Sequence, residues 1–297
     1  MMDFTLEVHD KTFDQIISPQ QDLHTIATGF RFLEGPVWHP RNNTLIFSDI
    51  MANGLFCRDA SGTVSLFREN SFLANGNTYD RSGRLITCEH GTSRVTRQEP
   101  DGTVTVLASH YQGRQLNSPN DVIVARDGSI FFTDPNPGRM GRVGIPRNQD
   151  LPFQGVFRID PDGGLALVSR DFSKPNGLCL SLDETRLFVN DTDHGHIRCF
   201  DLGPGGSVSG GDVWAELYGS EPGVADGMKF DSQGSLFCAG PGGIQVFDGQ
   251  ARLLGRVLMP EVAANFTWGD ADLRSLYITA TTSLYRLRVN VAGNPLF

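Results

Sequence analysis

The sequence is poor in lysine and in long apolar runs, and each shortage excludes a class of protein. Its 297 residues carry a net charge of −9, and only three of the basic residues are lysines: Lys11, Lys174 and Lys229. Affinity for nucleic acids and anionic membranes comes mostly from clustered Lys and Arg, so we expect neither as a partner. No apolar run approaches the ~20 residues that a membrane span needs.

Signal-peptide and disulfide patterns are missing as well. The segment Met1–Ile17 is acidic and has no basic region followed by an apolar one, as a secretory signal would. The five cysteines are widely spaced and form no C-x-x-C pair, which favours reduced thiols over a disulfide framework. We therefore predict a cytoplasmic protein.

Several catalytic signatures do not occur. The sequence has no G-x-S-x-G, no G-x-x-x-x-G-K-[ST], no H-E-x-x-H and no G-x-G-x-x-G. These absences argue against a serine hydrolase of the nucleophile-elbow type, a nucleotide hydrolase, an H-E-x-x-H metalloprotease and a dinucleotide enzyme.

What the chain does have is a repeat. A polar turn followed by a short apolar strand occurs six times, and the starts of successive copies are separated by 39 to 56 residues, close to the period of propeller blades. A second apolar strand and another turn follow each of the first five copies. The six copies are Arg41–Phe47, Asp80–Ile86, Arg126–Phe131, Leu182–Phe188, Asp231–Phe237 and Ala271–Tyr277.

This repeat predicts an all-β, six-bladed β-propeller with four antiparallel strands per blade. A two-sheet sandwich also alternates strands and turns, but it would not repeat one four-strand unit six times. The sixth unit lacks its last strand, so we predict that residues 22–30 close the ring as the outer strand of the last blade. Residues 1–297 would form a single domain, with 1–21 as an N-terminal extension.

One polar position recurs in every unit. Counting back 10 or 11 residues from the equivalent Leu or Ile reaches a carboxylate or amide each time, at the start of the innermost strand. These ring positions are Glu34, Asn75, Asn120, Asn176, Asp226 and Asn265. Asn, Asp and Gly are common turn residues before a strand, but six matches in register, one of them Glu, favour a functional ring at one mouth of the central channel.

The ring is rich in oxygen ligands and has no nearby His or Cys, which favours a hard divalent cation. Calcium is our first choice, because magnesium demands stricter geometry; zinc and manganese remain open. The longest loop, Asp134–Gln154, would lie on the same face and is a candidate lid with three arginines, although a mobile solvated loop is the alternative.

Strand ends on that face carry further titratable groups. His90 could orient a substrate hydroxyl or move a proton, although a structural histidine is equally compatible with the sequence. The run from Asp191 to His196 looks like a zinc cluster in isolation, and it includes Asp193 and His194. We discount it, since His196 already begins the next strand and no matching ligand pair is evident.

Four segments of the chain resemble the signatures of the gluconolactonase, senescence-marker-protein and luciferin-regenerating-enzyme family. They are Phe32–Trp38, Leu116–Val122, Lys174–Leu178 and Ala225–Met228. The likeness runs from about Thr25 to Leu287 and is greatest to the bacterial gluconolactonases, through Cys88–Gly91 and Ala74–Gly76. One departure is Ser118, where some animal members have an arginine that contacts substrate.

The resemblance implies a six-bladed propeller that opens sugar lactones with one divalent cation. Its ligands would be Glu34, Asn120, Asn176 and Asp226, and Asp226 would also take a proton from the attacking water. We expect substrate contacts from Asn75, His90, Asp121, Asp134 and Asn265. The alternatives are a lactonase or esterase of other substrates, and a non-catalytic propeller stabilised by calcium. The sequence leaves open the physiological lactone, the metal and the oligomeric state.

Overall fold

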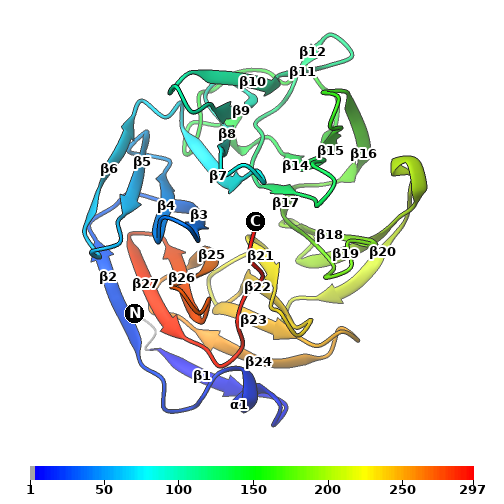
Figure 1. Cartoon of the computed structure of the whole chain (residues 1–297). Coiled ribbons are helices and arrows are strands. Elements are labelled where there is room, and N and C mark those ends of the chain that lie inside the picture. Colours follow the sequence, from blue (N-terminus) through cyan, green and yellow to red (C-terminus); the bar gives the residue numbers. More distant parts are fainter. Residues whose placement is uncertain (1–3) are drawn as a thin grey trace.

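A computed structural model describes residues 4–297, and it shows a six-bladed β-propeller (Figure 1). Each blade is an antiparallel sheet whose first strand lies at the central channel. Among the described residues, no helix is long and apolar enough to cross a membrane.

The first three blades take up residues 33–172. Blade 1 consists of β3 (Leu33–His39), β4 (Thr44–Asp49), β5 (Gly54–Arg58) and β6 (Val64–Glu69); blade 2 of β7 (Ala74–Tyr79), β8 (Leu85–Glu89), β9 (Arg94–Gln98) and β10 (Val104–Ala108); and blade 3 of β13 (Val122–Val124), β14 (Ile130–Asp134), β15 (Gln154–Ile159) and β16 (Leu165–Phe172). The short hairpin of β11 (His110–Tyr111) and β12 (Arg114–Gln115) connects blades 2 and 3, and the 3₁₀ turn η1 (Pro137–Arg139) lies in the long loop of blade 3.

The last three blades complete the ring. Blade 4 consists of β17 (Pro175–Leu180), β18 (Arg186–Asp191), β19 (His196–Leu202) and β20 (Val208–Glu216), with the 3₁₀ turn η2 (Pro204–Gly206); blade 5 of β21 (Met228–Phe230), β22 (Leu236–Gly240), β23 (Gly243–Phe247) and β24 (Leu253–Leu258); and blade 6 of β25 (Ala263–Gly269), β26 (Ser275–Ala280), β27 (Ser283–Arg288) and β2 (Leu23–Thr28).

The ring closes as the incomplete sixth repeat predicted. Strand β2 pairs antiparallel with β27, from Leu23 opposite Leu287 to Thr28 opposite Ser283. Residues 23–28 and the end of the repeat are thus held in one sheet, and the prediction of a closing strand is confirmed.

The segment before this strand is more ordered than a plain extension. Strand β1 (Thr5–Val8) adds a fifth strand to the outer edge of blade 5 by pairing with β24, and Arg256 forms an ion pair with Glu7 at 2.6 Å. The four-residue helix α1 (Phe13–Ile16) follows, and its fully buried Phe13 packs into the core of blades 5 and 6. The extension therefore covers the outer edge of a blade.

Apolar side chains pack between neighbouring blades. Because successive side chains of a strand point to opposite faces of its sheet, each blade offers apolar side chains to both of its neighbours. Trp38 of blade 1 stacks on Tyr277 of blade 6 at 5.7 Å between ring centroids, and Phe237 of blade 5 meets Trp268 of blade 6 at 5.0 Å. Contacts of this kind fix the angle between blades, and so the diameter of the ring.

The glycines that follow four of the ring positions are explained by close approach of the innermost strands. A Cβ at Gly35, Gly76 or Gly177 would lie 2.0 to 2.4 Å from a backbone carbonyl oxygen of the next blade, and one at Gly227 would meet the Asn265 side chain at 2.1 Å. These glycines let adjacent innermost strands converge at the channel mouth, which brings the ring positions together.

Replacing one of these glycines should destabilise the protein. We expect Gly76→Ala to lower the free energy of unfolding by about 1 to 3 kcal/mol, the usual cost of overpacking, because its Cβ would lie 2.4 Å from the Asn120 carbonyl oxygen. Gly249→Ala is the matched control, since nothing lies within 4 Å of the added carbon. Denaturant titration of both variants checks this, and equal midpoints would contradict it.

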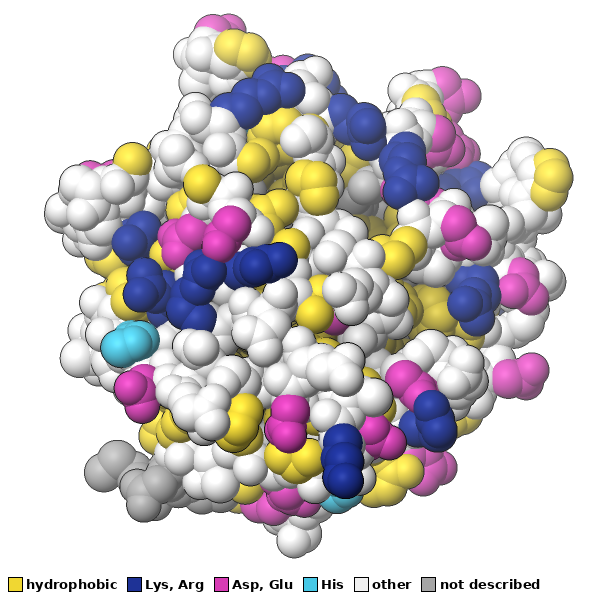
Figure 2. Space-filling model, turned by 60° about the horizontal axis from the view of Figure 1, so that its bottom comes forward, with side chains coloured by type: hydrophobic (Ala, Val, Ile, Leu, Met, Phe, Trp, Pro, Cys, Tyr) yellow, Lys and Arg dark blue, Asp and Glu magenta, His cyan; other side chains and the backbone are white. Residues whose placement is uncertain are grey.

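The opposite mouth of the channel holds a cavity of about 490 Å³, among the ends of the innermost strands and residues 294–297. Phe297 lies against His39 and Tyr79, with ring centroids 5.2 and 6.0 Å apart, and Figure 1 shows the C-terminus at the centre of the ring. The C-terminal tail thus narrows the end of the channel that lies away from the ring positions. Figure 2 shows acidic and basic side chains interspersed around one face of the molecule.

Candidate functional site

The ring positions converge at one mouth of the central channel. Glu34, Asn75, Asn176 and Asn265 lie near the starts of β3, β7, β17 and β25, while Asn120 and Asp226 come two residues before β13 and β21. Adjacent blades are tied together here: Gly76 N donates to Asn120 O at 2.8 Å, and Gly227 N donates to Ala264 O at 2.9 Å. The predicted register therefore corresponds to a real cluster.

Three carboxylates form the centre of this cluster. Burial raises the pKa of Glu34 to about 7, and the negative charge of Asp121 adds to the effect. Burial and the neighbouring Glu34 raise the pKa of Asp226 well above its usual range. Asp121 is buried with a raised pKa too, although the charge of Lys229 opposes the shift. Ionised acids so close together need a compensating positive charge.

Asn176 has an oxygen without a partner at this point. Its Nδ2 donates to Thr192 Oγ1 at 3.0 Å and to Ala225 O at 3.4 Å, whereas its buried Oδ1 has no hydrogen-bond partner. Leaving a buried acceptor unpaired costs about 1 to 3 kcal/mol. The side chain is held with its nitrogen committed and its oxygen available, which fits a ligand atom.

The donor set fits a hard divalent cation. Glu34, Asp226, Asn176 and Asn120 offer carboxylate and amide oxygens, which are the ligands that calcium prefers. Burial of the two carboxylates would make an ion of opposite charge favourable there. These four residues could hold such an ion.

A lysine and an amide lie beside the carboxylates. Lys229 Nζ donates to Asn265 Oδ1 at 3.0 Å, and Phe266 N donates to the same oxygen at 2.8 Å. These two donors orient the amide so that its nitrogen is free for the acids, and hydrogen bonds from Asn265 lower the pKa of both Glu34 and Asp121. Asn265 and Asp121 thus lie beside Glu34 at the channel mouth, and their contact with a substrate stays a prediction.

His90 lies at the edge of the site, and both of its ring nitrogens form hydrogen bonds within the protein. Its Nε2 accepts from Asn75 Nδ2 at 3.1 Å, and its Nδ1 donates to Val143 O at 3.0 Å. Burial, together with the charge of Arg147, lowers the pKa of His90 to about 4, so the ring is neutral. In this structure His90 fastens the long loop to Asn75 and offers no free nitrogen to a substrate.

A neutral buried histidine makes stability depend on pH. Its pKa rises from about 4 in the folded chain to 6.5 when exposed, so the unfolded chain binds more protons between these values. We expect stability to fall as the pH drops from 6.5 towards 4, with His90 contributing up to about 3 kcal/mol. His90→Gln, which keeps one donor and one acceptor, should reduce this loss.

Urea titrations at about pH 7 and pH 5 would measure this effect as the difference between wild type and variant, with exposed His110→Gln as the control. Identical pH dependence in wild type and His90→Gln would show that the imidazole is not held neutral.

Asp134 does not reach the site, contrary to the expected substrate contact. It is completely buried, and its two oxygens accept Asn117 N at 2.7 Å and Ser118 N at 2.8 Å. Burial raises its pKa to about 7. These amides lie three and two residues before Asn120, so Asp134 positions the ring residue of its own blade.

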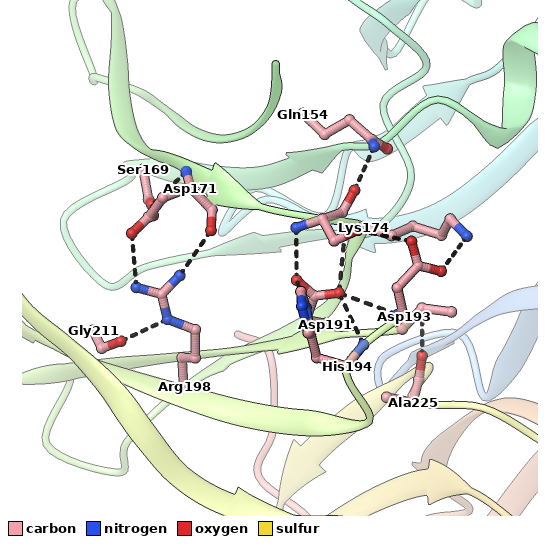
Figure 3. Close-up of polar contacts among 12 residues, drawn as sticks. Gln154, Ser169, Asp171, Lys174, Asp191, Asp193, His194, Arg198, Gly211 and Ala225 are labelled. Carbon is pink, nitrogen blue, oxygen red and sulfur yellow. Dashed lines mark hydrogen bonds and ion pairs between the residues drawn. The ribbon is translucent and has the colours of Figure 1, made fainter.

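The same arrangement, an aspartate that accepts two backbone amides before a ring residue, recurs in blades 1 and 4. Asp49 accepts the amides of Arg31 and Phe32, three and two residues before Glu34. Asp191 accepts those of Ser173 and Lys174, three and two residues before Asn176 (Figure 3). The aspartates at the ends of β4, β14 and β18 thus fix the backbone that enters the site.

The long loop of blade 3 is tied down by its arginines. Arg139 is buried and donates to the backbone oxygens of Asn117 and Leu116 at 2.8 and 2.6 Å. Arg147 donates to His90 O at 2.7 Å, while Arg142 lies over the Phe32 ring of blade 1 at 5.9 Å. Two of the three guanidinium groups thus hold the loop rather than a ligand.

Some residues of the site carry no signal in the repeat. Asn77 donates to Gly35 O at 2.9 Å, and Asn190 accepts Gly177 N at 3.2 Å, so each fixes the backbone beside a ring residue. Thr192 donates to Ala225 O at 2.6 Å while accepting from Asn176. They lie at different places in their blades, so only the clustering of polar residues near the ring positions could have found them.

The chain is similar in sequence to proteins of a known family. The sequence pattern described as "SMP-30/Gluconolactonase/LRE-like region" matches residues 32–282. The chain belongs to this family. Among similar proteins, a gluconolactonase of Zymomonas mobilis is 30% identical over 94% of this chain and 85% of its own length. A pentonolactonase of Haloferax volcanii is 30% identical over 92% of this chain and 96% of its own.

Solved structures extend the likeness to three dimensions. A gluconolactonase of Xanthomonas campestris superposes with a TM-score of 0.90 and 33% identity, over 96% of this chain and 95% of the other. The ring positions Glu34, Asn75, Asn120, Asn176, Asp226 and Asn265 all fall within the matched family region. Membership in the family, which four sequence segments had indicated, is confirmed.

Proposed function

We propose that the protein hydrolyses a sugar lactone with the help of one divalent cation, most simply calcium. The observation that carries this is the channel mouth itself, where Glu34 and Asp226 lie side by side with pKa values raised by burial and Asn176 Oδ1 lacks a partner. A gluconolactonase and a pentonolactonase at 30% identity over nearly the whole chain supply the substrate class.

In this proposal Glu34, Asn120, Asn176 and Asp226 hold the cation. When bound, the ion supplies positive charge that polarises a lactone carbonyl and stabilises the negative charge that develops on its oxygen. It would also keep both carboxylates ionised near neutral pH, which Asp226 needs in order to accept a proton. Asp226 would thus serve both as a ligand of the cation and as the general base.

Asp226 takes the proton of the attacking water, in our proposal. Asp226 is a half-buried residue at the channel mouth, whereas Asp134 is completely buried and bonded to backbone amides, so Asp226 is the better placed of the two to meet a water molecule. Asn75, Asp121 and Asn265 surround the same mouth and offer amide donors and a carboxylate acceptor to the hydroxyl groups of a sugar ring. His90, held by Asn75 and Val143, supports Asn75 rather than the substrate.

Proton release over a panel of lactones tests this proposal. Chelator-treated protein is mixed with hexonolactones, pentonolactones and aliphatic lactones, each with calcium, zinc, manganese, magnesium or chelator alone. We expect sugar lactones to be opened only when a cation is present. Undiminished hydrolysis in chelator would contradict the cation's role, and no hydrolysis of any lactone would favour a non-catalytic propeller or an esterase of another substrate.

A further inference from the structure

Blade 4 carries a second group of ligating side chains, outside the channel. Asp191, His194 and His196 each offer one nitrogen or oxygen atom, and these atoms lie within 4.8 Å of one another. The sequence had seemed to lack a matching ligand pair, because His196 begins β19. The hairpin between β18 and β19 nevertheless returns His196 beside Asp191, its register partner.

The turn itself does not require these histidines. Blade 1 makes a turn of the same length between β4 and β5, and Asp49 there accepts Arg31 N, Phe32 N and Ala52 N just as Asp191 accepts Ser173 N, Lys174 N and His194 N. The residues that stand at the positions of His194 and His196 in blade 1 are Ala52 and Gly54. The imidazoles are therefore additional to the folding role of the aspartate.

The local geometry suits a metal ion. His194 Nδ1 lies 3.1 Å from Asp191 Oδ2, and the two imidazole rings stack with centroids 5.3 Å apart. A tetrahedral zinc ion at about 2.1 Å from its ligands would bring them to roughly 3.4 Å from one another. The side chain of His194 is 57% exposed, so it can make that small movement.

Neighbouring groups leave the cluster open. Asp193 accepts a hydrogen bond from Ser173 Oγ at 2.8 Å and forms an ion pair with Lys174, which Figure 3 shows. The charge of Lys174 is therefore already paired. Asp191 is fixed by hydrogen bonds from the backbone amides of Ser173 and Lys174, while the side chain of His194 is exposed to solvent. One fixed carboxylate and two imidazoles then leave a fourth position for water.

We infer that Asp191, His194 and His196 form a second metal site that takes a borderline transition ion, such as Zn²⁺ or Co²⁺, rather than calcium. Two imidazole nitrogens and one oxygen are the donor set that selects such ions, whereas the channel mouth offers oxygen alone. The ion clamps the turn between β18 and β19, in which Thr192 positions Asn176. This site does not depend on the lactonase proposal.

Cobalt serves as the probe, because four-coordinate Co²⁺ absorbs visible light far more strongly than the six-coordinate ion that an all-oxygen site favours. Chelator-treated wild type should bind Co²⁺ with an intense visible band, and Glu34→Gln should keep that band because the channel mouth is separate. The double variant His194→Ala/His196→Ala should lose it, and His110→Ala, which removes an exposed histidine elsewhere, should not. With calcium present in excess to fill the channel mouth, Zn²⁺ should raise the Tm of wild type and of His110→Ala, but not of the double variant.

Circular dichroism of the metal-free proteins shows whether each variant is folded. His194→Gln alone provides a milder change, for which we expect at least a tenfold loss of Co²⁺ affinity. Survival of the intense visible band in the double variant would overturn the inference, whatever the lactone assays show. So would the absence of that band in wild type at millimolar Co²⁺.

Discussion

Asp226→Asn is expected to reduce kcat for lactone hydrolysis by about 10²- to 10⁴-fold, the usual contribution of a general base, even when the cation is saturating. Asparagine keeps an oxygen that can serve as a ligand but cannot accept a proton from water. The measurement is initial rate against cation concentration, at saturating lactone, so that the loss of binding and the loss of proton transfer are seen separately.

The control for this variant is Asp162→Asn, an exposed aspartate whose Oδ1 accepts only Gly164 N, at 2.9 Å. It should retain the wild-type rate. If Asp226→Asn recovered the wild-type kcat at high cation concentration, Asp226 would be a ligand alone and the base would have to be sought elsewhere, with Asp121 as a buried acid of the same cluster.

The architecture could be predicted because each blade repeats the same local pattern of turns and strands. Polar turns and apolar strands specify each hairpin independently, so six copies gave the blade count, and the missing strand of the last copy predicted β2. Strand β1 has no such signal. Its residues Thr5–Val8 follow no repeat, and their pairing with β24 depends on an outer edge that exists only in the folded ring.

The site shows a similar division. The register of the innermost strands predicted which residues meet at the channel mouth, because equivalent positions of a closed ring are neighbours. It could not tell which way a strand-end carboxylate turns. Asp134 and Asp191 end equivalent strands, and both turn back to the amides that precede the ring residue of their own blade.

Contacts between distant segments set the remaining roles. The sequence left open whether His90 contacts a substrate or has a structural role, and only the fold of the loop after Asp134 brings Val143 O to its Nδ1 at 3.0 Å. The partner of Asp191 is His196 across a hairpin, which ligand spacing along one strand does not reveal. Side-chain direction and long-range partners are therefore what the sequence pattern left undetermined.

Asn176→Ala should weaken cation binding at the channel mouth by more than the 10- to 100-fold that loss of an outer-sphere partner typically costs. The variant removes an oxygen that is buried without a hydrogen-bond partner. Thr192→Val keeps the amide but deletes the hydroxyl that accepts from Asn176 Nδ2 at 3.0 Å and donates to Ala225 O at 2.6 Å, so a loss of about 10- to 100-fold is expected there.

Calorimetric calcium titration measures the calcium affinities of Asn176→Ala and Thr192→Val directly. The control is Asn42→Ala, which removes an exposed amide at the opposite face and should bind calcium like wild type. The lactone-opening rate of Asn176→Ala should return towards that of wild type at high cation concentration, because its base is intact, whereas that of Asp226→Asn should not. Equal calcium affinity in Asn176→Ala and wild type would mean that the unpaired oxygen serves the substrate instead of the ion. The two variants together therefore separate holding the cation from moving the proton.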